Sequence, residues 1–157
     1  MKFIHLLVFL FSIQGFSIAC ECGEFKTAIS ELSSANTVFL GTVTSIQRIE
    51  RPPDTPGFYP INKVTFSTSH LWKDDFKNRS EIIVYTGVDS AACGFDFRPG
   101  SRYLVYSCLF EDKLHTSICD RTFELIKGIK LSHSVYRNEF DFLNSNCKNR
   151  LDYYQKQ

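Results

Sequence analysis

The sequence lacks an excess of charge of either sign. It contains 18 lysine and arginine residues against 17 aspartate and glutamate residues, which gives a formal net charge of +1. Nucleic-acid binding depends on clustered positive charge that neutralises phosphate groups. We interpret the basic residues near the end, Lys148, Arg150 and Lys156, as part of a solvated tail. We therefore expect no nucleic-acid partner.

The sequence also lacks a long hydrophobic run after its first residues. The apolar stretch at residues 3–13 is interrupted by His5 and Ser12. A transmembrane helix needs roughly 20 consecutive apolar residues, so this stretch is too short to span a bilayer. No later segment comes close to that length. We therefore expect a soluble mature protein without a transmembrane segment.

A catalytic or metal-binding spacing is absent as well. His115 and His133 stand in no nucleophile–base or metal-ligand pattern, and we interpret them, with Glu139, as ordinary strand, cap and helix-surface residues. Cys20 and Cys22 are separated by a single residue, whereas redox and zinc-knuckle pairs have two intervening residues. We therefore expect no enzymatic activity and no cofactor of the protein's own.

The first 19 residues read as a removable secretory signal. Lys2 precedes the apolar stretch, and the small residues up to Ala19 follow it, in the order of charge, core and cleavage site that export signals share. Cleavage after Ala19 leaves residues 20–157 as a single secreted, extracellular domain with equal numbers of basic and acidic side chains. A bacterial lipoprotein signal with acylation of Cys20 is the rival interpretation, but such signals usually have a leucine-like residue where this chain has Ser17.

All six cysteines of the sequence follow the predicted leader. An even number of cysteines in an exported chain favours disulfide bonds over zinc ligation or redox chemistry. Asn78 begins an Asn-Arg-Ser triplet, which fits the acceptor pattern for glycosylation on a eukaryotic secretory route.

The periodicity predicts helices at the two ends of the mature chain and strands between them. In the first helix, Phe25, Ala28, Ile29 and Leu32 share one face. The expected helices cover residues 25–32 and 131–147, and the expected strands cover residues 37–49, 64–72, 81–86, 103–109 and 114–125. Residues 51–57 are expected to form an exposed loop. Five short antiparallel strands with two terminal helices predict a mainly β fold, a small closed Greek-key barrel.

Several of these segments together carry a resemblance to a known family. They are the Cys-Glu-Cys start of the mature chain, the strand at residues 38–43, the Ala-Cys-Gly at residues 92–94, the turn and strand at residues 100–106, and the segment at residues 116–119. In order and spacing they resemble the amino-terminal, netrin-like domain of the tissue inhibitors of metalloproteinases, and the chain is most similar to single-domain members. The resemblance implies a five-stranded OB-like Greek-key barrel with flanking terminal helices, stapled by disulfides.

The resemblance also implies two disulfide bonds. Cys20 is expected to pair with Cys93, and Cys22 is expected to pair with Cys119. Cys108 and Cys147 then remain, and a bond between them follows only by exclusion, because the family's third bridge uses a cysteine that this chain lacks. The alternative is that both of these cysteines are unbridged thiols.

The activity that the resemblance implies is inhibition of an extracellular zinc metalloproteinase by a monomeric protein. The α-amine and carbonyl oxygen of the mature amino terminus, Cys20, would bind the catalytic zinc, which is present only as part of the target enzyme. The residues implied to contact the protease are Glu21, Cys22, Gly23, Glu24, Ser90, Ala91, Ala92, Cys93 and Gly94.

Two departures from the family pattern bear on this activity. Glu21 stands where these inhibitors usually place a small serine or threonine, and a carboxylate in an apolar pocket without a partner costs several kcal/mol. Gly23 and Glu24 stand where prolines are common in the family. We therefore expect weak or selective inhibition. The alternative is a secreted netrin-like module that binds another protein without inhibiting a protease.

Overall fold

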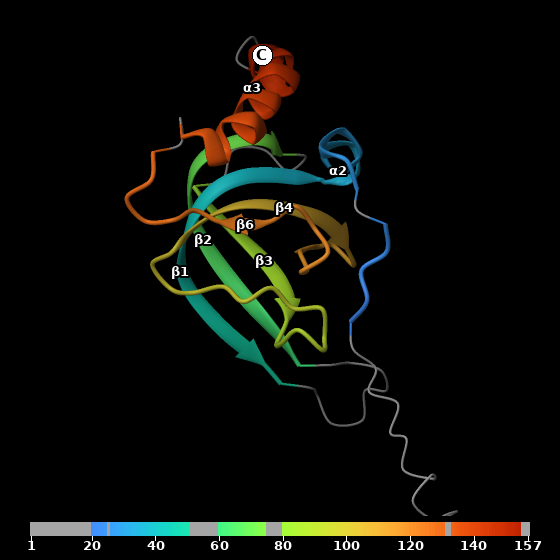
Figure 1. Ribbon diagram of the computed structural model, residues 1–157. Coiled ribbons are helices and arrows are strands. Elements are labelled where there is room, and N and C mark those ends of the chain that lie inside the picture. The colour runs from blue at the N-terminus through green and yellow to red at the C-terminus, as the bar shows by residue number, and fades with distance from the viewer. Residues whose placement is uncertain (1–19, 25, 51–59, 75–79, 131–132, 155–157) are drawn as a thin grey trace, which may run out of the picture.

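The computed structural model describes residues 20–24, 26–50, 60–74, 80–130 and 133–154 (Figure 1). The predicted leader, the loop at residues 51–57 and the acceptor Asn78 lie outside the described residues. The elements in chain order are α2 (Ala28–Ser34), β1 (Thr37–Ile49), β2 (Ile61–Asp74), β3 (Glu81–Gly87), β4 (Arg102–Phe110), β5 (Lys113–His115), β6 (Phe123–Glu124) and α3 (Ser134–Tyr154). Neither of these helices is long and apolar enough to cross a membrane.

The strands form one mixed, mainly β sheet that is partly ring-like. Antiparallel pairings join β1 to β2 and β2 to β3, a parallel pairing joins β3 to β5, and β5 pairs antiparallel with β4. Strand β4 also pairs antiparallel with β1, and β6 adds to β4 as a short extra strand. The described sheet therefore has six strands, and it is not the closed five-stranded barrel that the sequence predicts.

The difference arises at the expected strand over residues 114–125. The Asp120 carboxylate accepts hydrogen bonds from the Ser117 backbone N–H at 2.7 Å and the Ser117 hydroxyl at 2.9 Å, which closes a tight turn in the middle of this segment. Short polar side chains that bond nearby backbone offer the chain an alternative to a strand. The segment is consequently divided into β5, which is only three residues long, and β6.

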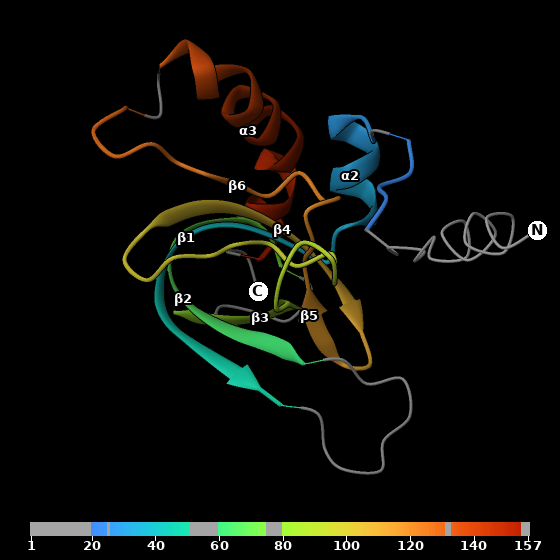
Figure 2. The same cartoon turned by 60° about the horizontal axis from the view of Figure 1, so that its bottom comes forward.

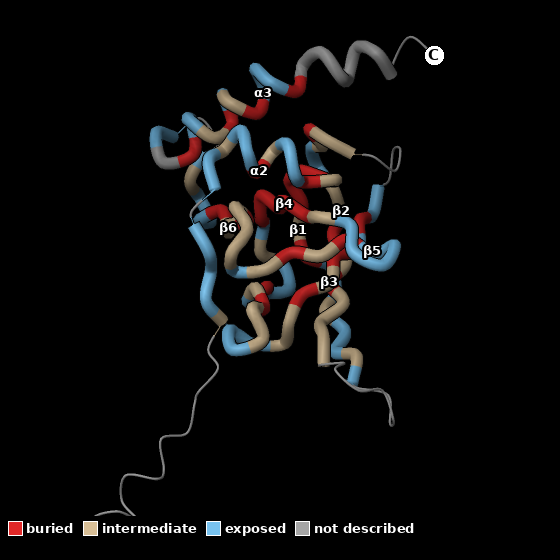
Figure 3. Tube along the Cα trace, turned by 90° about the vertical axis from the view of Figure 1, so that its right-hand side faces the viewer, coloured by how far each residue is buried: buried red, intermediate tan, exposed pale blue. Residues whose placement is uncertain are grey.

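Alternation along the strands divides the buried residues between two apolar clusters. On β1, Phe39 and Val43 face the inside of the curved sheet, whereas Val38 and Leu40 face the helices. The inner cluster contains Phe39, Val43, Val64, Phe66, Ile82, Val84, Phe97, Tyr103, Val105 and Leu114. The helix-side cluster contains Ala35, Val38, Leu40, Trp72, Leu104, Tyr106, Leu125, Tyr136, Phe140, Leu143 and Cys147. Figure 3 shows the buried positions concentrated along β1, β4 and the inward side of α3.

Both helices lie on the same side of the strands (Figures 1 and 2). Helix α3 packs on the helix-side cluster through residues such as Leu143, which is fully buried. Its polar side chains add to this packing. The Trp72 indole donates to Asn144 at 2.8 Å, and the Tyr106 hydroxyl donates to Glu139 at 2.5 Å, where Arg121 also forms an ion pair. Glu139 is therefore directed toward the sheet rather than lying on the helix surface as predicted.

Helix α2 turns a different face to the sheet from the one that its periodicity predicts. Ile29 was expected on the packed face, yet 61% of its surface is exposed. Glu31 is instead fully buried. The helix begins at Thr27, whose side chain accepts a hydrogen bond from the Ser30 backbone N–H at 3.2 Å, an ordinary amino-terminal cap. The Glu31 carboxylate lies beside the Lys26 ammonium, as described below.

Two glycines lie where the backbone departs from regular structure. At the turn before β4, Gly100 has φ of +79°, and the Ser101 N–H donates to the Arg98 carbonyl at 3.1 Å, as a type II turn requires. Within β1, the register with β2 shifts between Leu40 and Gly41. This is the bulge that a glycine inside a long strand predicts.

Candidate functional site

Two disulfides hold the beginning of the described chain against loops that are distant in sequence. Cys20 is bonded to Cys93 with a Cα–Cα distance of 5.2 Å, and Cys22 is bonded to Cys119 with a Cα–Cα distance of 5.3 Å. Both implied pairings are therefore confirmed. The sulfur of Cys20 lies 4.0 Å from the sulfur of Cys119, so the two bonds lie side by side.

The amino-terminal segment, residues 20–24, has little other support. Cys20 is partly buried, whereas the four residues after it are exposed. Glu21, which is at the position expected to enter a protease pocket, is exposed to solvent. The covalent bonds at Cys20 and Cys22 therefore fix this exposed stretch in place, where burial alone would not.

The 90–94 loop, to which Cys20 is bonded, is built by local hydrogen bonds. Asp89 accepts the Ala92 N–H through its carboxylate at 2.9 Å and the Gly94 N–H through its carbonyl at 2.7 Å. The Cys93 N–H donates to the Ser90 carbonyl at 3.2 Å. Cys93 itself has φ of 56°, a left-handed conformation that a residue with a Cβ adopts only when its surroundings impose it.

The same loop needs glycine at two positions where backbones approach closely. A Cβ placed on Gly94 would lie 2.1 Å from the Gly87 carbonyl oxygen, and one placed on Gly87 would lie 2.2 Å from the Ala92 carbonyl oxygen. Real Cβ atoms essentially never come under 3.0 Å. The end of β3 can therefore support the loop, and through it Cys93, only because both side chains are absent.

The 117–120 turn, to which Cys22 is bonded, is connected to the 90–94 loop. The Cys119 N–H donates to the Ser117 hydroxyl at 3.2 Å, and Asp120 closes the turn as described above. The Ile118 N–H donates to the Cys93 carbonyl at 3.1 Å. The two loops that receive the disulfides therefore form one continuous support.

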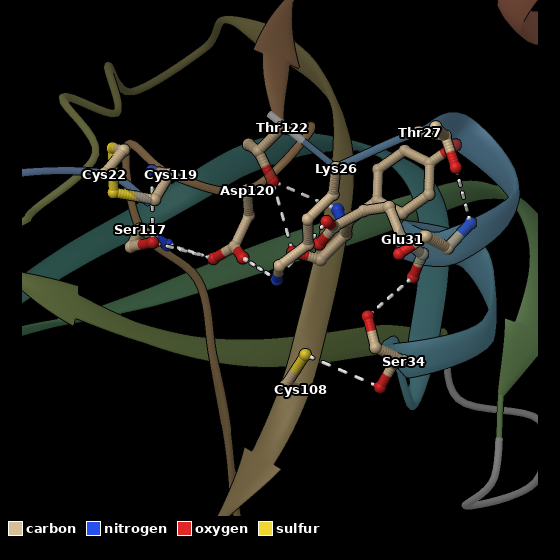
Figure 4. Close-up of polar contacts among 12 residues, drawn as sticks. Cys22, Lys26, Thr27, Glu31, Ser34, Cys108, Ser117, Cys119, Asp120 and Thr122 are labelled. Atoms are coloured by element: carbon tan, nitrogen blue, oxygen red, sulfur yellow. Dashed lines mark hydrogen bonds and ion pairs between the residues drawn. A yellow bond between two sulfur atoms is a disulfide. The ribbon is translucent and has the colours of Figure 1, made fainter. Parts of the chain in front are cut away.

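A polar cluster of Lys26, Glu31 and Asp120, of which Glu31 is fully buried, joins the amino-terminal segment to α2. The Lys26 ammonium lies 3.4 Å from a Glu31 carboxylate oxygen and 3.9 Å from an Asp120 carboxylate oxygen, between the two acids (Figure 4). The Glu31 side chain is only 1% exposed. Through Asp120, this cluster contacts the turn that carries Cys119, so Lys26 ties α2 to the same support as the disulfide.

The pKa values of Glu31 and Lys26 are both shifted in this cluster. Burial, opposed by Lys26, raises the pKa of Glu31, and the nearby Asp120 charge raises it further. Burial disfavours the charged form of Lys26, but the attraction of Glu31 and Asp120 outweighs this effect and raises the pKa of Lys26. Sequence reasoning missed the cluster because Lys26 and Glu31 are not at helical spacing and Asp120 is far away along the chain.

The predicted bond between Cys108 and Cys147 is wrong, since both residues are present as thiols. The Cys108 sulfur donates to the Ser34 carbonyl at 3.6 Å, at the end of α2 (Figure 4). Cys147 is buried in the helix-side cluster under α3. Cys108, on β4, thus contacts α2, whereas Cys147 is part of α3 itself. Burial, with the nearby charge of Asp120 and then Glu31, raises the pKa of the Cys108 thiol.

The histidine at residue 115 lies on β5 as predicted, and its ring stacks on Tyr85 with centroids 5.6 Å apart. Burial, followed by the charge of Lys113, lowers its pKa. Among the residues that the structure describes, no group of three or more histidine, cysteine, aspartate or glutamate side chains could hold a metal ion.

Comparison with protein-family models gives no match for this sequence, and comparison with curated proteins gives none either.

Proposed function

We propose that the mature protein is a secreted, monomeric inhibitor of an extracellular zinc metalloproteinase. The observation that carries this proposal is that two adjacent disulfides fix the partly buried Cys20 and the exposed residues 21–22 to one support. Removal of the leader would place the α-amine of Cys20 at the edge of this support. Glu21, Cys22, Gly23 and the 90–94 loop would then form the surface around it.

The chemistry of this terminus suits a catalytic zinc ion. Catalytic zinc keeps a position open for water or substrate, and the α-amine and carbonyl oxygen of one residue can occupy it together. An α-amine has a pKa of about 7.7–8.0, so its neutral form is accessible near neutral pH, unlike that of a lysine. Because the segment is already fixed by covalent bonds, little ordering entropy is lost on binding. The protein would hold no metal of its own and would catalyse no reaction.

We also propose that this partly ring-like sheet is a variant of the OB fold. The succession of pairings, from β1 through β2, β3, β5 and β4 back to β1, supports this assignment. In such folds the ligand surface lies on the loops at the ends of the strands. The 90–94 loop follows β3, and the 117–120 turn follows β5, so both lie where such a surface is expected.

Glu21 would set the selectivity of the inhibitor. Its carboxylate is exposed in this protein and would have to enter the specificity pocket of the protease. An unpartnered carboxylate in an apolar pocket costs several kcal/mol, whereas a basic group in the pocket would offset that cost. We therefore expect strong inhibition only of a protease with a basic specificity pocket, and Glu21→Thr should broaden the range of targets.

The test is an inhibition assay of two proteins against a panel of extracellular zinc proteases. The first begins at Cys20, and the second carries one additional alanine before Cys20. The added alanine converts the Cys20 amine into an amide, which does not bind zinc, and moves the free α-amine to a residue that neither disulfide holds. The first protein should therefore inhibit and the second should not. Equal inhibition by both would exclude chelation by the terminus.

A second candidate function is a protein-binding module that inhibits no protease. The exposed Glu21, at a position where the family usually has a small residue, favours this candidate. Failure of both proteins to inhibit any protease in a panel that includes enzymes with basic pockets would support it.

A further inference from the structure

A pocket of about 390 Å³ is lined in part by Ser90 and Gly94 of the 90–94 loop. This volume is within the range of about 300–1,000 Å³ that is usual for sites that hold small ligands. Its floor is apolar, and the six apolar residues that line it are Ile46, Val64, Val88, Phe95, Phe97 and Ile118. These residues come from β1, β2, the loop after β3 and the turn after β5.

The charged residues that line the pocket are all acidic. Asp89 and Asp96 line it together with Asn62 and Ser90, and no lysine or arginine is among its lining residues. Both aspartates are exposed, so their carboxylates belong to the rim rather than to the floor. The pocket therefore combines a mainly apolar lining with an acidic rim.

This pocket adjoins the proposed protease-binding edge. Gly94 forms part of its wall and is next to Cys93 in the chain, while Ile118 forms another part and is next to Cys119. The Ile118 N–H is also bonded to the Cys93 carbonyl. A protein bound across residues 20–23 would therefore have its own surface close to the pocket.

We propose that the pocket receives a lysine or arginine side chain from the protein that binds the amino-terminal segment. This proposal rests on the proposed function, since it specifies a second contact with the same target. Long basic side chains pack an apolar stem on apolar surface and keep the charged head near water. The floor and the rim of this pocket match those two parts.

The local contacts of the two aspartates are compatible with a visiting cation. Asp89 uses one carboxylate oxygen to accept the Ala92 N–H, which fixes the carboxylate at the rim. Asp96 lies 3.5 Å from Arg98, but both side chains are largely exposed, at 86% and 67%. Exposed ion pairs of this kind contribute little to stability. Arg98 would therefore compete only weakly with a bound cation for the Asp96 carboxylate.

The experiment measures binding of small probes to the processed protein, residues 20–157, by NMR. The probes are Nα-acetyl-arginine methylamide and its neutral counterpart Nα-acetyl-citrulline methylamide. We expect saturable shifts of the Gly94, Phe95 and Ile118 amides with the arginine probe. We also expect about fivefold weaker binding of the citrulline probe, as exposed charge pairs of this kind would give.

A matched set of variants tests the role of the carboxylates. Asp89→Asn combined with Asp96→Asn removes both charges while leaving an oxygen that can accept the Ala92 N–H, and it should abolish the preference for arginine over citrulline. Asp112→Asn is the control, because Asp112 lies outside the pocket at φ of 59°, a conformation that asparagine tolerates. The control should keep the preference.

The pocket and the amino terminus can be tested separately. The protein with one additional alanine before Cys20 should bind the arginine probe as well as the protein that begins at Cys20, although it should not inhibit a protease. Equal affinity for arginine and citrulline, or shifts that do not map to the pocket, would overturn the pocket proposal and leave the chelation proposal standing. Loss of inhibition in the protein that begins at Cys20, with the arginine preference intact, would overturn chelation alone.

Discussion

The two ends of the described chain are attached to the sheet in opposite ways. Helix α3 buries Tyr136, Phe140 and Leu143 against the helix-side cluster and has no disulfide. The amino-terminal segment, residues 20–24, is mostly exposed and is held by two disulfides. An element that hides an apolar face is stabilised by burial, roughly 25 cal/mol per Å² of apolar surface. A segment that must stay exposed to bind a partner cannot be stabilised by burial of apolar surface. It therefore depends on covalent bonds and on close backbone contacts.

The largest expected effect comes from removing one of those bonds. Cys22→Ser combined with Cys119→Ser should lower the free energy of unfolding by about 2–5 kcal/mol, as loss of a native disulfide usually does. It should also weaken inhibition, because residues 21–24 would then be held only through the remaining bond of Cys20 to Cys93. Urea unfolding and a protease assay measure the two effects. The matched control is Cys108→Ser, a cysteine outside both disulfides, which should change stability by less than about 1 kcal/mol. Equal losses in the two variants would contradict the covalent role.

The next prediction concerns the glycine contact under the 90–94 loop. Gly94→Ala should lower the unfolding free energy by about 3 kcal/mol, because its Cβ would meet the Gly87 carbonyl oxygen at 2.1 Å. Gly23→Ala is the matched control, since no atom lies within 4 Å of its Cβ position. Thermal unfolding of both variants compares them directly. A stable Gly94→Ala protein with an unchanged 90–94 loop would show that the close approach is not required.

A smaller effect is expected at the carboxyl-terminal end. Burial, followed by the hydrogen bond to Glu139, raises the pKa of Tyr106, so its hydroxyl remains a donor at neutral pH. Tyr106→Phe should lower the unfolding free energy by about 1.5 kcal/mol, the value of a hydrogen bond to a charged group. It should leave inhibition unchanged, because the hydroxyl that is removed is bonded to Glu139 on α3 and not to the amino-terminal segment. A loss of inhibition in a folded Tyr106→Phe protein would mean that the two ends are coupled.

The smallest effect is a dependence of stability on pH. Because the pKa of Glu31 is raised in the folded state, its favourable contribution is present below the ordinary glutamate pKa and is lost as pH rises through the raised folded value. The unfolding free energy of the wild type relative to Glu31→Gln should therefore fall between mildly acidic and neutral pH. Denaturant titrations of both proteins at several pH values measure this difference. A difference that rises with pH would mean that Lys26 outweighs burial.

The strands were the part of the fold that the sequence predicted best. The expected strand over residues 37–49 coincides with β1, and the remaining long strands begin and end within three residues of their expected limits. Alternating apolar residues identify a strand reliably because each face packs on a different cluster. The break between β5 and β6 was missed, since it depends on one Asp120 carboxylate that competes with strand pairing.

The candidate site was predictable only in part, because much of it depends on contacts between distant residues. The disulfide partners of Cys20 and Cys22 were predicted from the family resemblance. They could not be deduced from the number of cysteines alone. Periodicity placed Ile29 on the packed face of α2, whereas Glu31 is buried there instead, with its carboxylate beside the Lys26 ammonium. The bond expected between Cys108 and Cys147 was inferred by exclusion, without evidence that the two residues meet.

The most direct test of the account is to block the α-amine of Cys20 without changing any side chain. Brief treatment of the processed protein with cyanate at mildly acidic pH carbamylates the α-amine in preference to lysine, because its pKa is lower. The account predicts that the carbamylated protein keeps its fold and both disulfides but inhibits its target at least about 100-fold more weakly, since a zinc–ligand contact worth several kcal/mol is lost. Undiminished inhibition by the carbamylated protein would contradict it.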